Sequence, residues 1–153
     1  GKAGRLVGRV SREQATYLEC QQLLERVALS SERDVAASAL SHGDRRLLEV
    51  AVAMATRPRL LFLDEPTAGM NPVERARLLA TIRTLSQEKR ATFVLVEHDM
   101  DVVFALSQRV VVRHRGELLC DGPPARVRGD ARVREVYLGD EVSEPAGAGG
   151  AAP

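Results

Sequence analysis

Cysteine is scarce in this 153-residue sequence, and its spacing fits neither a metal site nor a redox site. Cys20 and Cys120 lie far apart in the chain, and no CxxC pair is present. This argues against a zinc site and against a thiol redox motif. Two isolated cysteines without a secretory leader are typical of a reducing compartment, and we expect both side chains to be buried as small apolar residues.

Long apolar runs and an excess of charge of one sign are also lacking. No apolar run approaches the ~20 residues of a membrane-spanning helix. Charged residues make up 28% of the chain, yet the net charge is only +1. The arginines of the C-terminal region are interspersed with Asp130 and Glu135, which favours a solvated helix face over a phosphate-binding patch. We therefore expect a cytoplasmic protein that does not bind nucleic acid and reaches a membrane only through partner proteins.

What is present is an alternation of helix and strand patterns. Short apolar runs at 59–64 and 92–96 are typical of parallel strands buried on both faces. The expected helices begin near Ser11, with Gln14 completing a capping box, at Asp44 and at Pro72. The segment from Leu47 to Ala55 is almost wholly apolar, which predicts a helix buried all round.

The second half of the chain predicts smaller elements. We expect a short helix at 99–106, followed by a hairpin of strands 109–113 and 117–121 that turns through His114, Arg115 and Gly116. We take His114 as a surface residue. Two short helical pieces should follow Pro124, the second at 130–138, and the Gly/Ala/Pro-rich residues 143–153 should be disordered.

Two adjacent carboxylates end the first predicted strand and give the strongest chemical signal. The run 60–66 reads Leu-Leu-Phe-Leu-Asp-Glu-Pro, so Asp64 and Glu65 emerge at the carboxyl edge of the sheet, where open α/β folds bind ligands. Such a pair can hold Mg²⁺ and orient a water for phosphoanhydride hydrolysis. A strand end followed by two solvated turn carboxylates is the alternative.

Further motifs flank this strand in a fixed order. Leu40-Ser41-His42-Gly43-Asp44 lies upstream, and Ala68-Gly69-Met70-Asn71-Pro72 and Val94-Leu95-Val96-Glu97-His98-Asp99 lie downstream. With these motifs the chain, from about residue 11 to 141, resembles the ATP-binding cassette (ABC) ATPases. The segments match the signature motif (40–44), Walker B (60–66), the D-loop (68–72) and the switch histidine (98).

The resemblance implies roles for individual residues. Asp64 would hold Mg²⁺ and Glu65 would polarise the attacking water, while His98 would contact the γ-phosphate of ATP. The signature residues Ser41, His42 and Gly43 would bind the γ-phosphate of ATP held by an opposite subunit, at the positive end of a helix. His42 and Asp44 depart from the common signature, which has glycine and glutamine there. We expect Asp44 to point away from phosphate or to cap the helix.

The D-loop residue Asn71 has two readings. It can cap the helix that starts at Pro72, which we rank first, or it can contact the nucleotide and the opposite subunit across a dimer interface.

The resemblance also implies a fold class and a domain plan. We expect an α/β fold that is the C-terminal part of a P-loop NTPase (ABC-type) nucleotide-binding domain, with a mostly parallel sheet, flanking helices and a C-terminal β-hairpin. Residues 1–43 would be a remnant of the helical subdomain, 44–142 the Walker B, D-loop and switch half of the core, and 143–153 a tail. The sequence contains no phosphate-binding loop of the form GxxxxGK[ST], so we expect the chain alone to be inactive.

Within the family, residues 40–44, 68–72 and 133–139 resemble the ATP-binding subunits of branched-chain amino acid importers. This implies ATP and Mg²⁺ as cofactors, a second ABC subunit and transmembrane permeases as partners, and an indirect link to a periplasmic solute-binding protein. The protein would lie on the inner face of the cell membrane. The alternatives are a urea or amide importer, a lipopolysaccharide-export ATPase and a non-catalytic interaction module. A DNA-repair ATPase is disfavoured because coiled-coil heptads and a basic surface are lacking.

Overall fold

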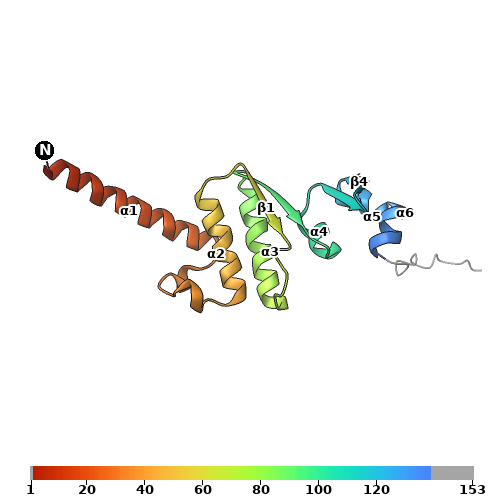
Figure 1. Cartoon of the computed structure of the whole chain (residues 1–153), viewed down its shortest axis with the longest axis horizontal. Coiled ribbons are helices and arrows are strands. Elements are labelled where there is room, and N and C mark those ends of the chain that lie inside the picture. Colours follow the sequence, from red (N-terminus) through yellow and green to blue (C-terminus); the bar gives the residue numbers. More distant parts are fainter. Residues whose placement is uncertain (1, 139–153) are drawn as a thin grey trace, which may run out of the picture. The chain divides into compact units, whose positions relative to one another are not determined.

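The chain divides into two units, which are described separately: residues up to Val96 and residues from Glu97 onward. The computed structural model describes the backbone of residues 2–138 and the side chains of residues 13–137. Figure 1 shows the elements of both units and labels most of the helices and two of the strands, β1 and β4. The predicted disordered tail at 143–153 lies outside the described residues.

The first helix, α1, spans Lys2–Arg26, so the prediction that it begins near Ser11 is wrong. The residues before Ser11 have no apolar periodicity, but lysine, alanine, arginine and leucine among them are good helix formers. Ser11 is therefore inside the helix and does not cap it. The prediction that Cys20 is buried is also wrong, because its side chain is exposed on α1.

Helices α2 (His42–Ala55) and α3 (Pro72–Gln87) lie side by side and form the core of the first unit (Figure 1). Their buried residues recur at helical spacing, namely Leu47, Val50, Ala51 and Met54 of α2 and Leu78, Ile82 and Leu85 of α3. Val52 on the opposite side of α2 is 63% exposed. The expectation that α2 is buried all round is therefore wrong: this helix has one buried face.

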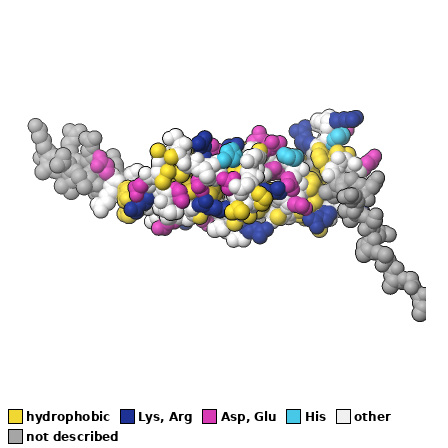
Figure 2. Space-filling view, turned by 90° about the horizontal axis from the view of Figure 1, so that it is seen from below, with side chains coloured by type: hydrophobic (Ala, Val, Ile, Leu, Met, Phe, Trp, Pro, Cys, Tyr) yellow, Lys and Arg dark blue, Asp and Glu magenta, His cyan; other side chains and the backbone are white. Residues whose placement is uncertain are grey.

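Strands β1 (Leu60–Asp64) and β2 (Thr92–Val96) pair in parallel, as predicted, with Leu60 opposite Thr92 and Asp64 opposite Val96. Burial on both faces is not observed. Residues 61–63 of β1 line a cleft of about 250 Å³ together with α2. Leu61 and Leu63 are half-buried there, whereas Phe62 is 65% exposed. The β1–β2 sheet has two strands, and one face of β1 lacks a cover among the described residues. Figure 2 shows hydrophobic side chains among the charged ones on one face of the molecule.

The second unit contains the predicted hairpin. After α4 (Met100–Leu106), strands β3 (Val110–His114) and β4 (Glu117–Gly122) pair antiparallel. The turn residues Arg115 and Gly116 have φ values of +49° and +86°. Positive φ at both central residues is the type I′ geometry that matches the twist of a two-residue hairpin.

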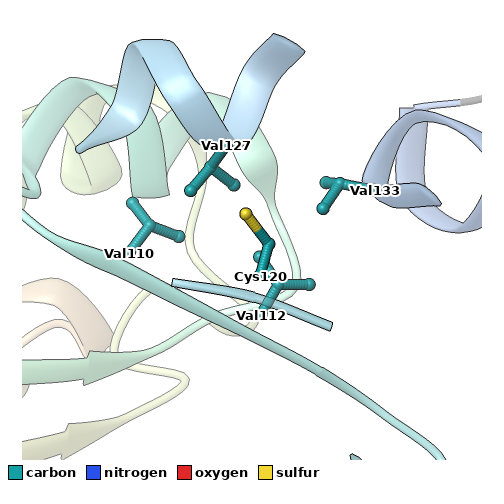
Figure 3. Close-up of a cluster of buried hydrophobic side chains, with 5 residues drawn as sticks. All are labelled: Val110, Val112, Cys120, Val127 and Val133. Carbon is teal, nitrogen blue, oxygen red and sulfur yellow. The ribbon is translucent and has the colours of Figure 1, made fainter. Parts of the chain in front are cut away.

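Short helical pieces close the second unit over a small apolar core. They are α5 (Pro124–Gly129), α6 (Ala131–Val133) and a π-helical turn, η3 (Arg134–Leu138). The core is drawn in Figure 3 and consists of Val110, Val112, Cys120, Val127 and Val133. His114, predicted to lie on the surface, is half-buried. Its ring centroid lies 6.3 Å from that of Tyr137, with the two rings edge to face.

Asp130 fixes the start of α6. Its Oδ1 accepts a hydrogen bond from Arg132 N at 3.0 Å, and its carboxylate pairs with the Arg132 guanidinium at 2.9 Å. The Arg132 hydrogen bond holds the pKa of Asp130 well below its usual range. Burial raises the pKa of the neighbouring Cys120 thiol, so this thiol stays protonated at neutral pH.

No helix in the described part of the chain has both the length and the apolar character needed to cross a membrane.

Core packing of α3 gives a first prediction. Leu78 is 1% exposed between α3 and α2, so Leu78→Ala should lower the free energy of unfolding by about 2–5 kcal/mol. Val73→Ala on the same helix, where the side chain is 78% exposed, is the control and should change it by no more than about 0.5 kcal/mol. Urea titrations followed by circular dichroism measure both. Equal losses in the two variants would contradict the assigned burial.

Asp130 gives a prediction about pH. A carboxyl group whose pKa is depressed in the folded state adds stability above its unfolded pKa and loses this contribution as the pH falls. Asp130→Asn should therefore destabilise the protein at pH 7 and have a smaller effect at about pH 3, below the ordinary pKa of aspartate. Urea titrations at both pH values measure the difference, with Glu117→Gln as a control for the loss of one exposed carboxylate. An effect of Asp130→Asn that does not depend on pH would contradict the pairing with Arg132.

A candidate nucleotide site at the starts of two helices and the end of a strand

The carboxyl end of β1 turns sharply out of the sheet at Glu65. Glu65 N donates to Val96 O of β2 at 2.9 Å, and the residue has a left-handed backbone with φ +40°. Such a conformation is uncommon and costly for a residue with a side chain, and strain of this kind is concentrated at functional sites. The turn leaves both Asp64 and Glu65 exposed at the predicted sheet edge.

The D-loop segment, residues 68–72, leads from this turn into α3. Ala68 N donates to Glu65 O at 3.0 Å, and Gly69 adopts a left-handed backbone with φ +72°. Asn71 then caps α3, because its Oδ1 accepts from Val73 N and Glu74 N at 3.0 Å each. The predicted capping role of Asn71 is confirmed. Its contact with nucleotide or with an opposite subunit stays a prediction.

The signature segment, residues 40–44, forms the start of α2, and Ser41 caps it as predicted. Ser41 Oγ accepts from Asp44 N at 3.1 Å and donates to Asp44 Oδ2 at 2.9 Å. His42 Nε2 lies 3.2 Å from Ala68 O of the D-loop segment. Gly43 N donates to the carboxylate of Glu74 on α3 at 3.2 Å. Each of these signature residues is thus already engaged within the chain.

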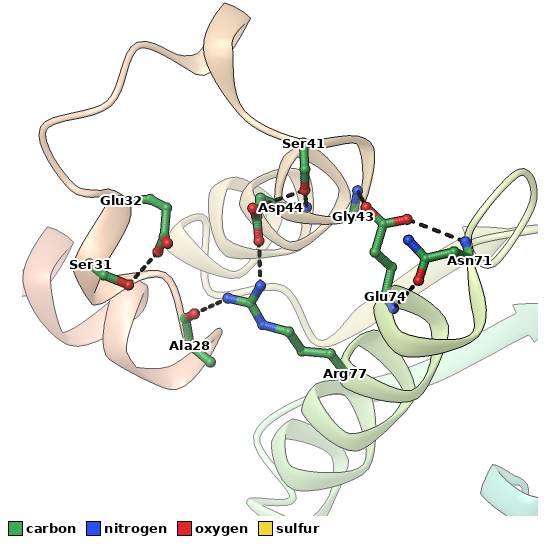
Figure 4. Close-up of polar contacts among 9 residues, drawn as sticks. All are labelled: Ala28, Ser31, Glu32, Ser41, Gly43, Asp44, Asn71, Glu74 and Arg77. Atoms are coloured by element: carbon green, nitrogen blue, oxygen red, sulfur yellow. Dashed lines mark hydrogen bonds and ion pairs between the residues drawn. The ribbon is translucent and has the colours of Figure 1, made fainter.

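Arg77 of α3 joins three segments of the first unit (Figure 4). Its guanidinium pairs with Asp44 Oδ1 and donates a second hydrogen bond to Ala28 O, beyond the end of α1. The Asp44 side chain is only 16% exposed. The expectation is that Asp44 points away from phosphate or caps the helix. Ser41 is the cap of α2, and the Asp44 carboxylate instead accepts from Ser41 Oγ and pairs with Arg77 on α3.

Glu74 and Arg77 were not among the predicted site residues. The spacing from Asn71 to Glu74 is that of a capping box, which could have drawn attention to Glu74. Arg77 has no such local signal, because its partner Asp44 is 33 positions away in sequence. The charge at Asp44, where the common signature has an uncharged glutamine, is the one hint that a basic partner is needed.

His98 is exposed just beyond the end of β2 and belongs to the second unit. Its role at the γ-phosphate therefore stays a prediction. Among the described residues, no three His, Cys, Asp or Glu side chains gather as ligands for a metal ion. The exposed Asp64 carboxylate fits Mg²⁺ nonetheless, because this ion is usually held by one or two carboxylates, waters and substrate phosphates.

Comparison with known protein families gives two matches. The ABC transporter family model matches residues 5–68, and the model of branched-chain amino acid ATP-binding cassette transporters matches residues 117–143. The first range holds the signature motif, the strand-end carboxylates and the start of the D-loop, and the second holds β4 to the C-terminal helices. The chain belongs to the ABC transporter ATP-binding family, and its α/β fold is that of part of a P-loop NTPase domain, as predicted.

Within this family, curated relatives involved in branched-chain amino acid transport are similar to the chain. The high-affinity transport ATP-binding protein BraF of Pseudomonas aeruginosa is 44% identical over 117 residues, and LivG of Escherichia coli is 41% identical over the same length. Each alignment covers 76% of this chain and 46% of the relative. The lipopolysaccharide export protein LptB of Acidithiobacillus ferridurans is 35% identical over 121 residues, which are 79% of this chain and 50% of that protein.

Solved structures agree with this assignment. An ATP-binding cassette of an ABC transporter in its ADP conformation superposes with a TM-score of 0.68 and 29% identity, over 80% of this chain and 49% of that one. A Clostridium perfringens protein that is part of the cbiONQ ABC transporter complex gives a TM-score of 0.71 and 27% identity, over 82% and 51%. The chain thus spans about half the length of the relatives it matches.

The ion pair between Asp44 and Arg77 gives a prediction for the site. The two side chains are 16% and 38% exposed, so a double-mutant cycle with Asp44→Asn and Arg77→Gln should give a coupling free energy of about 0.5–1 kcal/mol. Arg46 and Glu49, three residues apart on α2, form the matched control pair and should give about 0.3–0.5 kcal/mol. Urea titrations supply the four free energies of each cycle. Independent, additive effects at Asp44 and Arg77 would show that the pair does not couple the helices.

Proposed function

We propose that this chain supplies the signature-bearing, water-activating half of an ATP-hydrolysing subunit that drives the import of branched-chain amino acids. Its main support is the family model for branched-chain amino acid cassettes at residues 117–143. The 44% identity to the P. aeruginosa relative adds to it.

Glu65 is the proposed general base. Its exposed position just beyond β1 allows the carboxylate to reach a water in front of the sheet edge, and an ionised carboxylate can accept a proton from that water. Asp64 would hold Mg²⁺, which, when bound, supplies positive charge against the phosphates. That charge would also offset the repulsion between the adjacent carboxylates.

Ser41, His42 and Gly43 form the proposed trans site for the γ-phosphate of ATP held by a second ABC subunit. The start of α2 offers backbone N–H groups and the positive end of a helix dipole. His98 would contact a γ-phosphate through its imidazole, which can donate a hydrogen bond. Asn71 would add an amide contact across the subunit interface.

The proposed partners follow from the family. ABC transporter ATPases act as pairs and with permease subunits, so we propose that a second ABC subunit and transmembrane permeases bind this protein. Permeases would hold it at the inner face of the cell membrane, and a solute-binding protein would act indirectly. The permeases and that protein would select the solute.

Two other functions are alternatives. The 35% identity to LptB supports a lipopolysaccharide-export ATPase. A non-catalytic interaction module is the second alternative; such a module would bind ATP without hydrolysing it.

A chimera with the P. aeruginosa relative separates these functions. This chain would replace the matched 117 residues of BraF, and uptake of branched-chain amino acids would be measured in cells that lack BraF. The proposal predicts uptake with the chimera. ATP hydrolysis by the chimera without uptake would favour export, and ATP binding without hydrolysis would favour the interaction module.

Glu65→Gln in this chimera tests the catalytic assignment. The amide keeps the shape of the side chain but cannot accept a proton, so turnover should fall by about 100-fold or more while ATP binding is retained. Glu117→Gln, in the exposed part of the hairpin, is the control and should leave turnover unchanged. Phosphate release and nucleotide-binding assays measure the two quantities. Turnover of the Gln variant within about threefold of the parent would exclude Glu65 as the base.

A further inference from the structure

The carboxylate of Glu74 contacts the signature segment and the D-loop segment at the same time. Glu74 Oε1 accepts from Gly43 N at 3.2 Å, and Oε2 accepts from Asn71 N at 3.3 Å. Figure 4 shows the side chain between the start of α2 and the start of α3. A capping-box glutamate ordinarily serves its own helix, whereas this one also serves the neighbouring helix.

The lack of a side chain at Gly43 makes room for the Glu74 side chain. A Cβ atom at position 43 would lie 2.7 Å from Glu74 Cγ and 2.9 Å from Glu74 Cβ, closer than unbonded carbons approach. Gly43 lies within α2 and not in the left-handed region, so backbone conformation does not require a glycine there. In this arrangement the missing side chain lets Glu74 reach the buried amide.

We propose that Glu74 is a positioning residue with two effects. Its carboxylate connects the signature segment to the D-loop segment (the tie), and it occupies the Gly43 amide until a phosphate displaces it (the guarding role). The inference rests on the proposed function, in which the signature segment binds a γ-phosphate. A phosphate that approaches Gly43 N meets the Glu74 carboxylate on the same donor, and two anions there repel each other. Glu74 must then release Gly43, which also disturbs its bond to Asn71. Binding of nucleotide at the signature segment therefore changes the hydrogen bonding of the D-loop segment.

Amide hydrogen exchange in the 153-residue chain tests the tie without nucleotide. Glu74→Ala should speed exchange at both Gly43 and Asn71 by about tenfold or more, because both N–H groups lose their acceptor. Glu74→Gln keeps an oxygen acceptor and should restore slow exchange at Gly43. Glu49→Ala, which removes a carboxylate from α2 outside this contact, is the control. Unchanged exchange at Gly43 in Glu74→Ala would overturn the tie.

Steady-state kinetics of the BraF chimera tests the guarding role. Glu74→Gln removes the competing charge and should lower KM for ATP about threefold or more with kcat within about twofold, since ground-state binding alone is changed. Glu74→Ala should lower kcat, because the D-loop is no longer positioned. An unchanged KM in Glu74→Gln would overturn the competition. A chimera without any turnover would count against the proposed function, and the exchange result would still decide whether Glu74 forms the tie.

Discussion

Helices α2 and α3 begin next to each other, and this places two positive helix ends side by side. Each helix start presents N–H groups without partners in its own helix and about half a positive charge. Two such ends repel unless negative charge lies between them. Glu74 accepts hydrogen bonds from N–H groups at both helix starts. Asp44 adds a second carboxylate, whose negative charge is paired with Arg77. The packing of the first unit therefore depends on carboxylates at the place where we propose that a phosphate binds.

This arrangement connects the signature segment to the D-loop segment and to α3. His42 lies against Ala68 O, Gly43 is bonded to Glu74, and Asp44 is bonded to Arg77. The contacts come from consecutive residues at the start of α2 and reach both the D-loop segment and α3. Arg77 extends the connection to Ala28 O beyond α1.

The helix starts at this site and the hairpin turn of the second unit could be predicted because they depend on local sequence. The caps at Ser41 and Asn71 and the Arg115-Gly116 turn depend on neighbours within a few residues, and the sequence shows those neighbours. The bonds from α3 to α2 could not be predicted, since Glu74 and Gly43 are 31 positions apart. Burial of Phe62 was mispredicted because a strand's burial depends on what covers the sheet. The predicted start of α1 is wrong because the residues before Ser11 form a helix through intrinsic helix propensity and have no apolar periodicity.

At position 65, the left-handed backbone and the proposed chemistry favour different residues. Glycine would adopt φ +40° without strain, so folding alone would favour glycine at position 65. Hydrolysis as proposed requires a carboxylate at the same place. Selection for thermal stability alone would therefore drive this residue toward a form that cannot activate water.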